Sequence, residues 1–371
     1  MQGRAQFDPE SSEELRQLAT SAGIDPAGTI RARRERPDPA FFVGRGKVDE
    51  VKAMAAGMGC ELAIFDAALT PVQQRNLERE AGVPVLDRTG LILEIFAQRA
   101  QSREGKLQVE LARLQYQATR LVRGWTHLER QRGGIGLRGG PGEKQIELDR
   151  RMIADRVRQL KERLRALSRQ RQTQRRARSR GGDLRVSLVG YTNAGKSTLF
   201  QALSRSHPYI ADQLFATLDT TSRRCHAGPG ASFVLSDTVG FIRQLPHGLV
   251  DAFHSTLEES AHADLLLHVV DASSPARERQ MADVEGVLEE IEADRVARLT
   301  IYNKVDRLGR GAGLERGPCG SIAGVWLSAH TGEGIDLLRA VLAERIAEHA
   351  RAREPAGASA PEDATLGIPT T

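Results

Sequence analysis

The residues best suited to chemistry form a short loop that begins at Gly190 and reads Gly-Tyr-Thr-Asn-Ala-Gly-Lys-Ser. This spacing is that of a phosphate-binding loop, in which backbone N–H groups surround phosphates, a lysine reaches the β- and γ-phosphates and a serine hydroxyl binds Mg²⁺. The alternative is a glycine-rich turn without a ligand, but the loop follows a predicted strand and precedes a predicted helix, as this chemistry requires. The predicted phosphate-binding residues are Gly190, Tyr191, Thr192, Asn193, Ala194, Gly195, Lys196, Ser197 and Thr198.

A second group of residues could complete a magnesium site. Asp237-Thr238-Val239-Gly240 ends the next core strand, where a carboxylate can hold Mg²⁺ through water and the Gly240 amide can face the γ-phosphate. Between the two motifs, residues 215–221 lie where a mobile switch segment is expected, and a threonine there would bind Mg²⁺ only when the γ-phosphate is present. We choose Thr217 for this role, with Thr220 or Thr221 as alternatives. The simplest interpretation of the segment is a polar loop without a ligand. The predicted metal ligands are Ser197, Thr217 and Asp237, and the predicted catalytic residues are Lys196, Thr217 and Gly240.

Two further motifs indicate the base. In Asn303-Lys304-Val305-Asp306, the Asp306 carboxylate can accept from the ring N–H and the exocyclic amine of guanine, a donor pair that adenine lacks. The Lys304 stem can cover the base plane, and the backbone of Ser328-Ala329 can meet the guanine O6. Four motifs in this order, each at the carboxyl end of a predicted strand, predict binding of GTP and GDP.

Two positions bear on hydrolysis. Phe241 follows the Asp237–Gly240 motif and cannot orient an attacking water as a glutamine does, so intrinsic hydrolysis should depend on another residue, an ion or a partner. Asn193 could help hold a potassium ion beside the phosphates, or its side chain could make a local hydrogen bond within the loop. The sequence leaves both interpretations open.

Apolar runs predict the elements that position these residues. Strands are expected at 186–189, 233–235, 265–270, 299–302 and 325–327, with a last helix over 335–349, which together favour a doubly wound α/β domain. Towards the N-terminus, apolar runs at 41–43, 62–65 and 83–86 alternate with helical patterns and predict a small α/β unit. A helix over 12–22 is expected to begin at Ser11 or Ser12 as its cap.

Between these units, two leucine-rich seams have heptad spacing, over residues 107–128 and 153–167. Six glycines within 131–142 separate them, so we expect two antiparallel helices with a glycine-rich loop, followed by an exposed linker over 169–182. Residues 150–180 hold thirteen Lys or Arg and two acids, although the whole chain has a net charge of only +5. This concentration favours a nucleic-acid partner over a merely solvated helix face.

Composition sets the remaining limits. The chain has 371 residues and is 40% hydrophobic, and it lacks both an apolar run of membrane-spanning length and a hydrophobic signal core. Three widely spaced cysteines indicate isolated thiols in a reducing compartment, so we expect a cytoplasmic protein. The expected domains are an α/β subdomain over 1–102, a helical hairpin over 103–180, a GTPase domain over 181–350 and a disordered tail over 351–371.

The N-terminal half adds a more specific signal, because its motifs resemble those of the HflX-type translational GTPases in the same order. The GTPase part carries the general signature of the Era-like P-loop GTPases. The resemblance extends from about residue 40 to residue 340. The blocks that carry it are 42–48 (FVGRGKV), 64–66 (IFD), 69–77 (LTPVQQRNL), 87–97 (DRTGLILEIFA), 107–112 (LQVELA), 133–143 (GGIGLRGGPGE) and 149–151 (DRR).

This resemblance implies an α/β subdomain, an antiparallel helical hairpin and a Ras-like GTPase domain. It implies GTP hydrolysis stimulated by the ribosome, binding to the large (50S) subunit, and splitting or rescue of stalled ribosomes. The hairpin loop would touch ribosomal RNA, for which Arg132, Arg138 and Lys144 are the candidate contacts. The family has also been linked to ATP, but no second phosphate-loop pattern places such a site. A monomer is expected.

Two rival functions differ in class. One is a GTPase that acts on another RNA together with a catalytic partner. The other is an RNA-binding module, gated by the nucleotide or with a vestigial GTPase fold, that does not split ribosomes. The intact Lys196, Ser197, Asp237 and Asp306 argue against a vestigial site.

Overall fold

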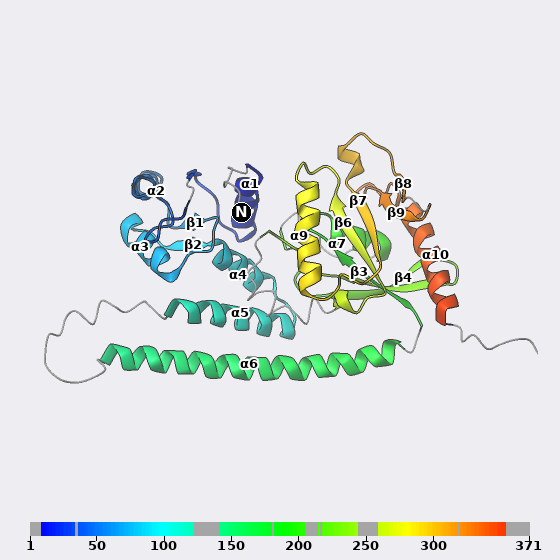
Figure 1. Ribbon diagram of the computed structural model, residues 1–371, viewed down its shortest axis with the longest axis horizontal. Coiled ribbons are helices and arrows are strands. Elements are labelled where there is room, and N and C mark those ends of the chain that lie inside the picture. The colour runs from blue at the N-terminus through cyan, green and yellow to red at the C-terminus, as the bar shows by residue number, and fades with distance from the viewer. Residues whose placement is uncertain are drawn as a thin grey trace, which may run out of the picture.

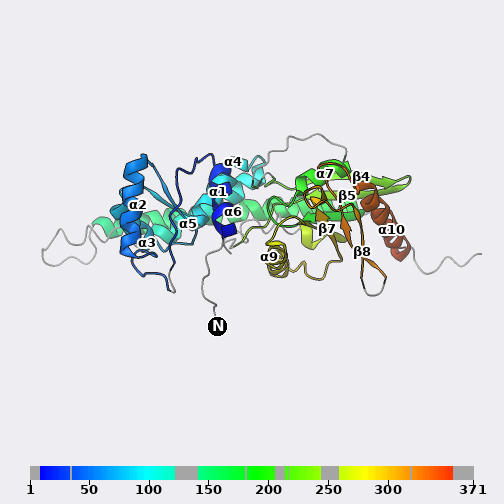
Figure 2. The same ribbon diagram turned by 90° about the horizontal axis from the view of Figure 1, so that it is seen from above.

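The fold has a small N-terminal unit and a larger sheet-containing unit side by side, with a long helix passing along both (Figures 1 and 2). It is a computed structural model that describes residues 9–33, 36–121, 141–179, 182–204, 214–215, 217–243, 259–317 and 320–353. Among these residues, none of the helices combines the length and apolar character that crossing a membrane requires.

The N-terminal unit is built on two short parallel strands. Strand β1 (Ala63–Phe65) pairs with β2 (Val85–Asp87), and the helices α1 (Pro9–Ser21), α2 (Arg45–Met58), α3 (Pro71–Ala81) and α4 (Arg88–Arg99) complete the unit. Helix α3 starts as its sequence suggests, because Thr70 and Gln73 form a reciprocal capping box and Pro71 occupies the first turn.

Two sequence-based expectations for this unit are wrong. Residues 41–43 form no strand, because Phe42 adopts a left-handed φ of 66° and makes only an isolated bridge to Asp38. Ser11 and Ser12 lie inside α1 instead of capping it, since the helix already includes Pro9. Ser11 instead hydrogen-bonds Asp66 and Arg243, which belong to different parts of the chain.

The two predicted antiparallel helices are present, although residues 122–128 of the first predicted seam lie outside the described residues. Helix α5 (Arg103–Leu121) packs antiparallel against α6 (Pro141–Ser179), with Leu111 and Leu160 buried (Figure 1). The prediction of an exposed linker over 169–182 is wrong, because α6 continues to Ser179. Arg and Gln have a high helix propensity, so this segment forms a helix even without an apolar seam. Most of the glycine-rich loop over 131–142 lies outside the described residues, but Pro141 and Gly142 already belong to the first turn of α6.

The larger unit has a seven-stranded sheet in the order β4-β5-β3-β6-β7-β9-β8, which confirms the doubly wound α/β prediction. Its strands are β3 (Leu184–Val189), β4 (Thr221–Gly228), β5 (Ala231–Asp237), β6 (Leu265–Asp271), β7 (Arg298–Asn303), β8 (Gly313–Arg316) and β9 (Ile322–Trp326). The two edge strands β4 and β8 are antiparallel to their neighbours and were not foreseen, because most of their side chains are polar or exposed.

Helices cover both faces of this sheet (Figure 2). Apolar residues of α7 (Lys196–Ser204) and α10 (Ile335–Arg353) share one core with β3, β5 and β6, whereas α9 (Arg277–Glu290) packs on the other face. The α9-side core is continuous with the N-terminal unit, since Phe96 and Val284 belong to one buried cluster. The two units therefore share a hydrophobic core beside the predicted phosphate loop.

Candidate nucleotide-binding site

The phosphate loop (residues 190–197) joins β3 to α7, and two of its glycines are required by close contacts. Gly190 has φ 149°, and a Cβ there would lie 2.2 Å from the carbonyl oxygen of Val269. Gly195 has φ 94°, and a Cβ there would lie 2.2 Å from the Asn303 side-chain nitrogen. Both positions therefore exclude any other residue, as a loop that wraps phosphates with its backbone requires.

Lys196 is buried in this loop, with 6% of its surface exposed. Its Nζ donates to the carbonyl oxygens of Gly190 at 3.0 Å and Tyr191 at 2.7 Å. Burial lowers the pKa of Lys196 to about 8, and the nearby Asp237 carboxylate opposes that shift. The ammonium is thus held by oxygen acceptors at the place where phosphate oxygens are predicted.

The three predicted metal ligands lie together. The hydroxyl oxygens of Ser197 and Thr217 are 2.8 Å apart, and each lies 2.9 Å from Asp237 Oδ2. Asp237 Oδ1 is buried and has no hydrogen-bond partner among the described residues. Burial raises the pKa of Asp237, while Lys196 and the two hydroxyls lower it. Two hydroxyls and a carboxylate with one unpaired buried oxygen form a donor set that fits Mg²⁺, a hard cation that prefers oxygen ligands.

The alternative threonines do not join this cluster. Thr221 is the first residue of β4 and is exposed, and the buried hydroxyl of Thr220 has no partner among the described residues. Of the three candidates, Thr217 is therefore the one that the fold brings to Ser197 and Asp237.

Gly240 packs against the phosphate loop. A Cβ at Gly240 would lie 3.0 Å from Lys196 Nζ and 3.0 Å from Thr192 Cα. Thr192 N donates to the Phe241 carbonyl at 2.7 Å, so this segment and the phosphate loop are joined by a short parallel bridge. Phe241 is 1% exposed and belongs to the shared core, and its apolar ring has no group that could orient a water.

The rest of the Asp237–Gly240 motif is also fixed to the sheet. Thr238 is fully buried, and its hydroxyl donates to the Leu188 carbonyl of β3 at 2.6 Å. Val239 is buried in the shared core.

The predicted guanine-binding residues lie at the ends of β7 and β9. Asn303 is buried, donates to the Ala194 carbonyl at 2.8 Å and accepts from the Ala329 amide at 2.9 Å. Lys304 has φ 67°, and its Nζ donates to the Asn193 carbonyl at 2.7 Å and to Asp271 Oδ2 at 2.7 Å. These bonds join the base end of the site to the phosphate loop.

Of the groups predicted to contact the base, the Asp306 side chain is exposed and Ser328 is buried. Asp306 is exposed on a short 3₁₀ turn, with its carboxylate accessible. Ser328 is fully buried, and its hydroxyl accepts from the Thr331 amide at 3.2 Å, which shapes the turn after β9. An exposed carboxylate beside this rigid turn is suited to hydrogen bonds with a planar base.

Residues from the N-terminal helix border the site, which sequence spacing did not reveal. The Tyr191 hydroxyl donates to Glu14 at 2.6 Å and accepts from the Arg243 amide at 3.0 Å. Glu14 also pairs with Arg88, which is 2% exposed and donates to Asp66 at 2.6 Å. A cavity of about 330 Å³ lies between α1, the phosphate loop and the start of α9. Asp271 is another missed residue, although its place at the end of β6 was a usable signal.

The candidate RNA contacts are only partly within the described residues. Arg132 and Arg138 lie outside them, and Lys144 belongs to α6 but its side chain is not described. The described part of α6 has a series of exposed basic residues: Arg150, Arg151, Arg158, Lys161, Arg163, Arg165 and Arg169. Arg156, in contrast, faces α5 and pairs with Glu110 at 2.6 Å.

Three sequence families match consecutive parts of the chain. They are described as GTP-binding GTPase N-terminal (residues 9–97), GTP-binding GTPase Middle Region (99–186) and 50S ribosome-binding GTPase (185–304). The first two cover the N-terminal unit and the helical pair, and the third covers the phosphate loop through Lys304.

Curated relatives and a solved structure agree with these matches. The chain is 53% identical to GTPase HflX of Magnetococcus marinus over 88% of this chain and 75% of that protein. It is 50% identical to GTPase HflX of Escherichia coli K12 over 91% of this chain and 80% of that protein. The crystal structure of SsGBP with GDP shares the fold, with a TM-score of 0.53 and 24% identity over 92% of this chain and 97% of that one. At this identity and coverage, the chain belongs to the HflX family of GTPases.

Proposed function

We propose that this protein is a GTP-driven switch that binds the 50S ribosomal subunit and splits or rescues stalled ribosomes. The observation that carries this proposal is the succession of α6, β3 and the phosphate loop along the chain. The described side chains of α6 include seven exposed basic residues. The helix ends at Ser179, and β3, which leads into the loop, begins at Leu184. An RNA-binding helix would thus be separated from β3 by only four residues, and β3 leads into the phosphate loop.

The residues of the site support hydrolysis of GTP. Lys196 would bind the β- and γ-phosphates, the Gly240 amide would face the γ-phosphate, and Asp306 would select guanine. Ser197, Thr217 and Asp237 would hold Mg²⁺, which supplies positive charge beside the phosphates when it is bound. Because Phe241 is buried, water positioning falls to another group, which is consistent with stimulation by the ribosome.

A potassium ion beside Asn193 is part of this proposal. Asn193 is exposed and has a left-handed φ of 59°. Its side-chain oxygen could bind a potassium ion that would supply positive charge beside the phosphates. GTP turnover in potassium and in sodium buffer tests it, and equal rates would leave the side chain with a local role only.

We also propose that the boundaries after residues 102 and 180 separate folding units of a cytoplasmic monomer. The predicted boundary after residue 350 is wrong because α10 continues to Arg353, and the rest of the predicted tail, residues 354–371, lies outside the described residues. The family matches end near the first two positions, at residues 97 and 186. Binding of ATP remains a proposal for the N-terminal half.

The decisive test is binding and turnover with purified 50S subunits. Co-sedimentation would compare the unchanged protein with Lys161→Ala/Arg165→Ala on α6, and with the control Arg345→Ala/Arg351→Ala on α10, whose residues are also partly or fully exposed. We expect the α6 pair to weaken binding and to lower the salt dependence by about 1–2 in log–log slope, because each lost phosphate contact contributes about 0.7–0.9. The α10 pair should behave as the unchanged protein.

Two outcomes would overturn parts of the proposal. Equal binding of both double variants would remove α6 from the RNA interface. GTP turnover that is indifferent to 50S subunits would favour the rival function, a GTPase that acts on another RNA, since a basic helix binds RNA backbones of any sequence.

A further inference from the structure

The switch segment (residues 215–221) is attached to the start of α5 through Asp219. One Asp219 carboxylate oxygen accepts from the backbone amides of Gln101 at 2.9 Å and Ser102 at 2.7 Å, and the other accepts from the Ser102 hydroxyl at 2.5 Å. The Ser102 hydroxyl in turn accepts from the Gly105 amide at 2.8 Å. A carboxylate is favoured here because it binds the free amides and the positive end of a helix N-terminus.

Gly105 provides the space for this carboxylate. A Cβ at Gly105 would lie 2.2 Å from Asp219 Oδ1, which is closer than any side chain tolerates. The first turn of α5 is therefore shaped around the carboxylate of Asp219, which lies 117 residues after Ser102 in the chain. The space left by Gly105 is an observation separate from the hydrogen bonds, and it also indicates that Asp219 docks onto the start of α5.

A second attachment holds the other side of Thr217. The Leu214 amide donates to the Ser21 hydroxyl of α1 at 3.1 Å. The Phe215 ring meets the Phe96 ring of α4 edge-on, with centroids 4.7 Å apart. Phe215 is 3% exposed and has φ 55°, a conformation that a bulky residue adopts only when its surroundings impose it.

Thr217 thus lies between two docked positions, one two residues before it and one two residues after it. Its hydroxyl is 2.8 Å from that of Ser197 and 2.9 Å from Asp237. A free loop must lose conformational entropy before it can place a ligand, whereas a loop held on both sides has already lost it.

We propose that Asp219 is a positioning residue for GTP hydrolysis, which holds Thr217 in the Mg²⁺ site by docking the switch segment onto α5. This inference rests on the proposed role of Thr217 as a metal ligand. The Asp219 carboxylate is bound by Gln101 and Ser102 and is not part of the cluster of Ser197, Thr217 and Asp237, so its effect would pass through Thr217. The N-terminal helices then supply part of the geometry that the GTP state needs.

The test is the Mg²⁺ concentration that gives half-maximal GTP turnover. We expect Asp219→Ala to raise it about tenfold and Ser102→Ala to raise it a few-fold, since the latter keeps the two amide donors. Gly105→Ala should act in the same direction without changing Asp219, because the added methyl group displaces the carboxylate. GDP affinity should stay within about twofold for all three, as the threonine is needed only with the γ-phosphate.

Two controls make the result specific. Glu94→Gln removes an exposed ion pair between α4 and Arg113 of α5 and should leave the Mg²⁺ requirement unchanged. Thermal unfolding identifies any variant that fails to fold, and Ser102→Ala, which removes a single hydroxyl, then carries the test.

Thr217→Ala distinguishes the assignment of Thr217 as a metal ligand from the assignment of Asp219 as a positioning residue. If Thr217→Ala raises the Mg²⁺ requirement but the Asp219, Ser102 and Gly105 variants do not, Thr217 is a ligand and the positioning role of Asp219 is wrong. If Thr217→Ala leaves the requirement unchanged, the ligand assignment is wrong and the positioning role falls with it.

Discussion

The phenolic hydroxyl of Tyr191 donates a 2.6 Å hydrogen bond to Glu14, and thereby ties the phosphate loop to the first helix of the chain. The same hydroxyl accepts from the Arg243 amide, two residues after Phe241. Burial, and then Glu14, raises the pKa of Tyr191, so the group stays a neutral donor at physiological pH. One side chain of the loop therefore joins three segments that are distant in sequence.

Removing that hydroxyl should loosen the contact between the two units. We expect Tyr191→Phe to lower the free energy of unfolding by about 1–3 kcal/mol, because the Glu14 carboxylate and the Arg243 amide both lose a partner. Denaturant unfolding measures the change. Tyr302→Phe, which keeps its ring stacked on Trp326, is the control. Equal losses in the two variants would show that the Tyr191 hydroxyl has no special role.

Lys196 gives a prediction with a defined pH dependence. Its pKa is about 8 in the folded protein because of burial, against an ordinary value of 10.5. The charged form is disfavoured on folding, so Lys196 costs stability below pH 8, and this cost disappears as the pH rises from about 8 to 10.5. In the nucleotide-free protein, Lys196→Met should therefore be stabilising at pH 7 and much less so at pH 10.

The same variant should lose GTP affinity at every pH. Binding by the unchanged protein should weaken above pH 8, because the phosphates require the protonated lysine. Denaturant unfolding and nucleotide titration at several pH values check both statements. Unchanged GTP binding by Lys196→Met would contradict the phosphate-loop assignment.

Asp306 should determine the base. Asp306→Asn exchanges an acceptor for a donor, so we expect preference to move from guanosine towards xanthosine nucleotides. Competition binding measures the shift, and Asp336→Asn, at the exposed start of α10, is the control. A variant that still prefers GTP as strongly as the unchanged protein would assign base recognition elsewhere.

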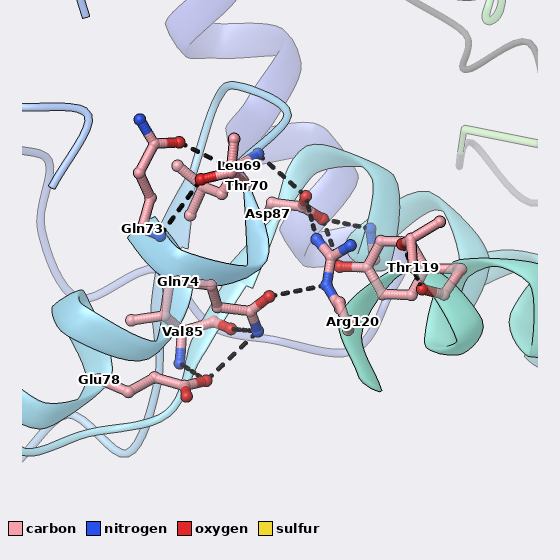
Figure 3. Close-up of polar contacts among 11 residues, drawn as sticks. Leu69, Thr70, Gln73, Gln74, Glu78, Val85, Asp87, Thr119 and Arg120 are labelled. Carbon is pink, nitrogen blue, oxygen red and sulfur yellow. Dashed lines mark hydrogen bonds and ion pairs between the residues drawn. The ribbon is translucent and has the colours of Figure 1, made fainter. Parts of the chain in front are cut away.

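Asp87 is expected to be the most sensitive polar position of the N-terminal unit. Its carboxylate is 1% exposed and accepts from Arg120 at 2.6 Å and from the amides of Leu69 and Gly90 (Figure 3). Arg120 also donates to Gln74, so the end of α5 is tied to α3 (Figure 3).

Replacing Asp87 by alanine should cost about 3 kcal/mol, since it leaves several buried donors unpaired. A fall in the thermal midpoint measures this cost, and the exposed Asp25→Ala should leave the midpoint nearly unchanged. A small effect at Asp87 would mean that water replaces the carboxylate.

The sequence predicted the elements whose signals are local. Apolar runs predicted the core strands. Residue spacing predicted the phosphate loop and the pair Asn303 and Asp306, which lie after β3 and at and after the end of β7. The edge strands β4 and β8 could not be predicted from apolar character, because they form strands by pairing with their neighbours β5 and β9. The extension of α6 to Ser179 could not be predicted from periodicity, because this part of the helix has no apolar seam.

Contacts between distant segments could not be predicted in the same way. Asp219 and Ser102 are separated by 117 residues, and nothing in either local pattern indicates the other. Glu14 and Tyr191, 177 residues apart, are a second case. Such pairs are fixed only when the two units share a core, which single-sequence periodicity does not report.

Helix α6 is long and uninterrupted, so a change of its direction at one end displaces the other end. With 39 residues at about 1.5 Å each, the helix is about 58 Å long. Its Ser179 end is close to the sheet, and its Pro141 end projects beyond the N-terminal unit (Figure 1). Turning such a rod by one degree about its inner end moves the outer end by about 1 Å. Any rotation of α6 at its Ser179 end would therefore produce a larger displacement at its Pro141 end, in proportion to the length of the helix.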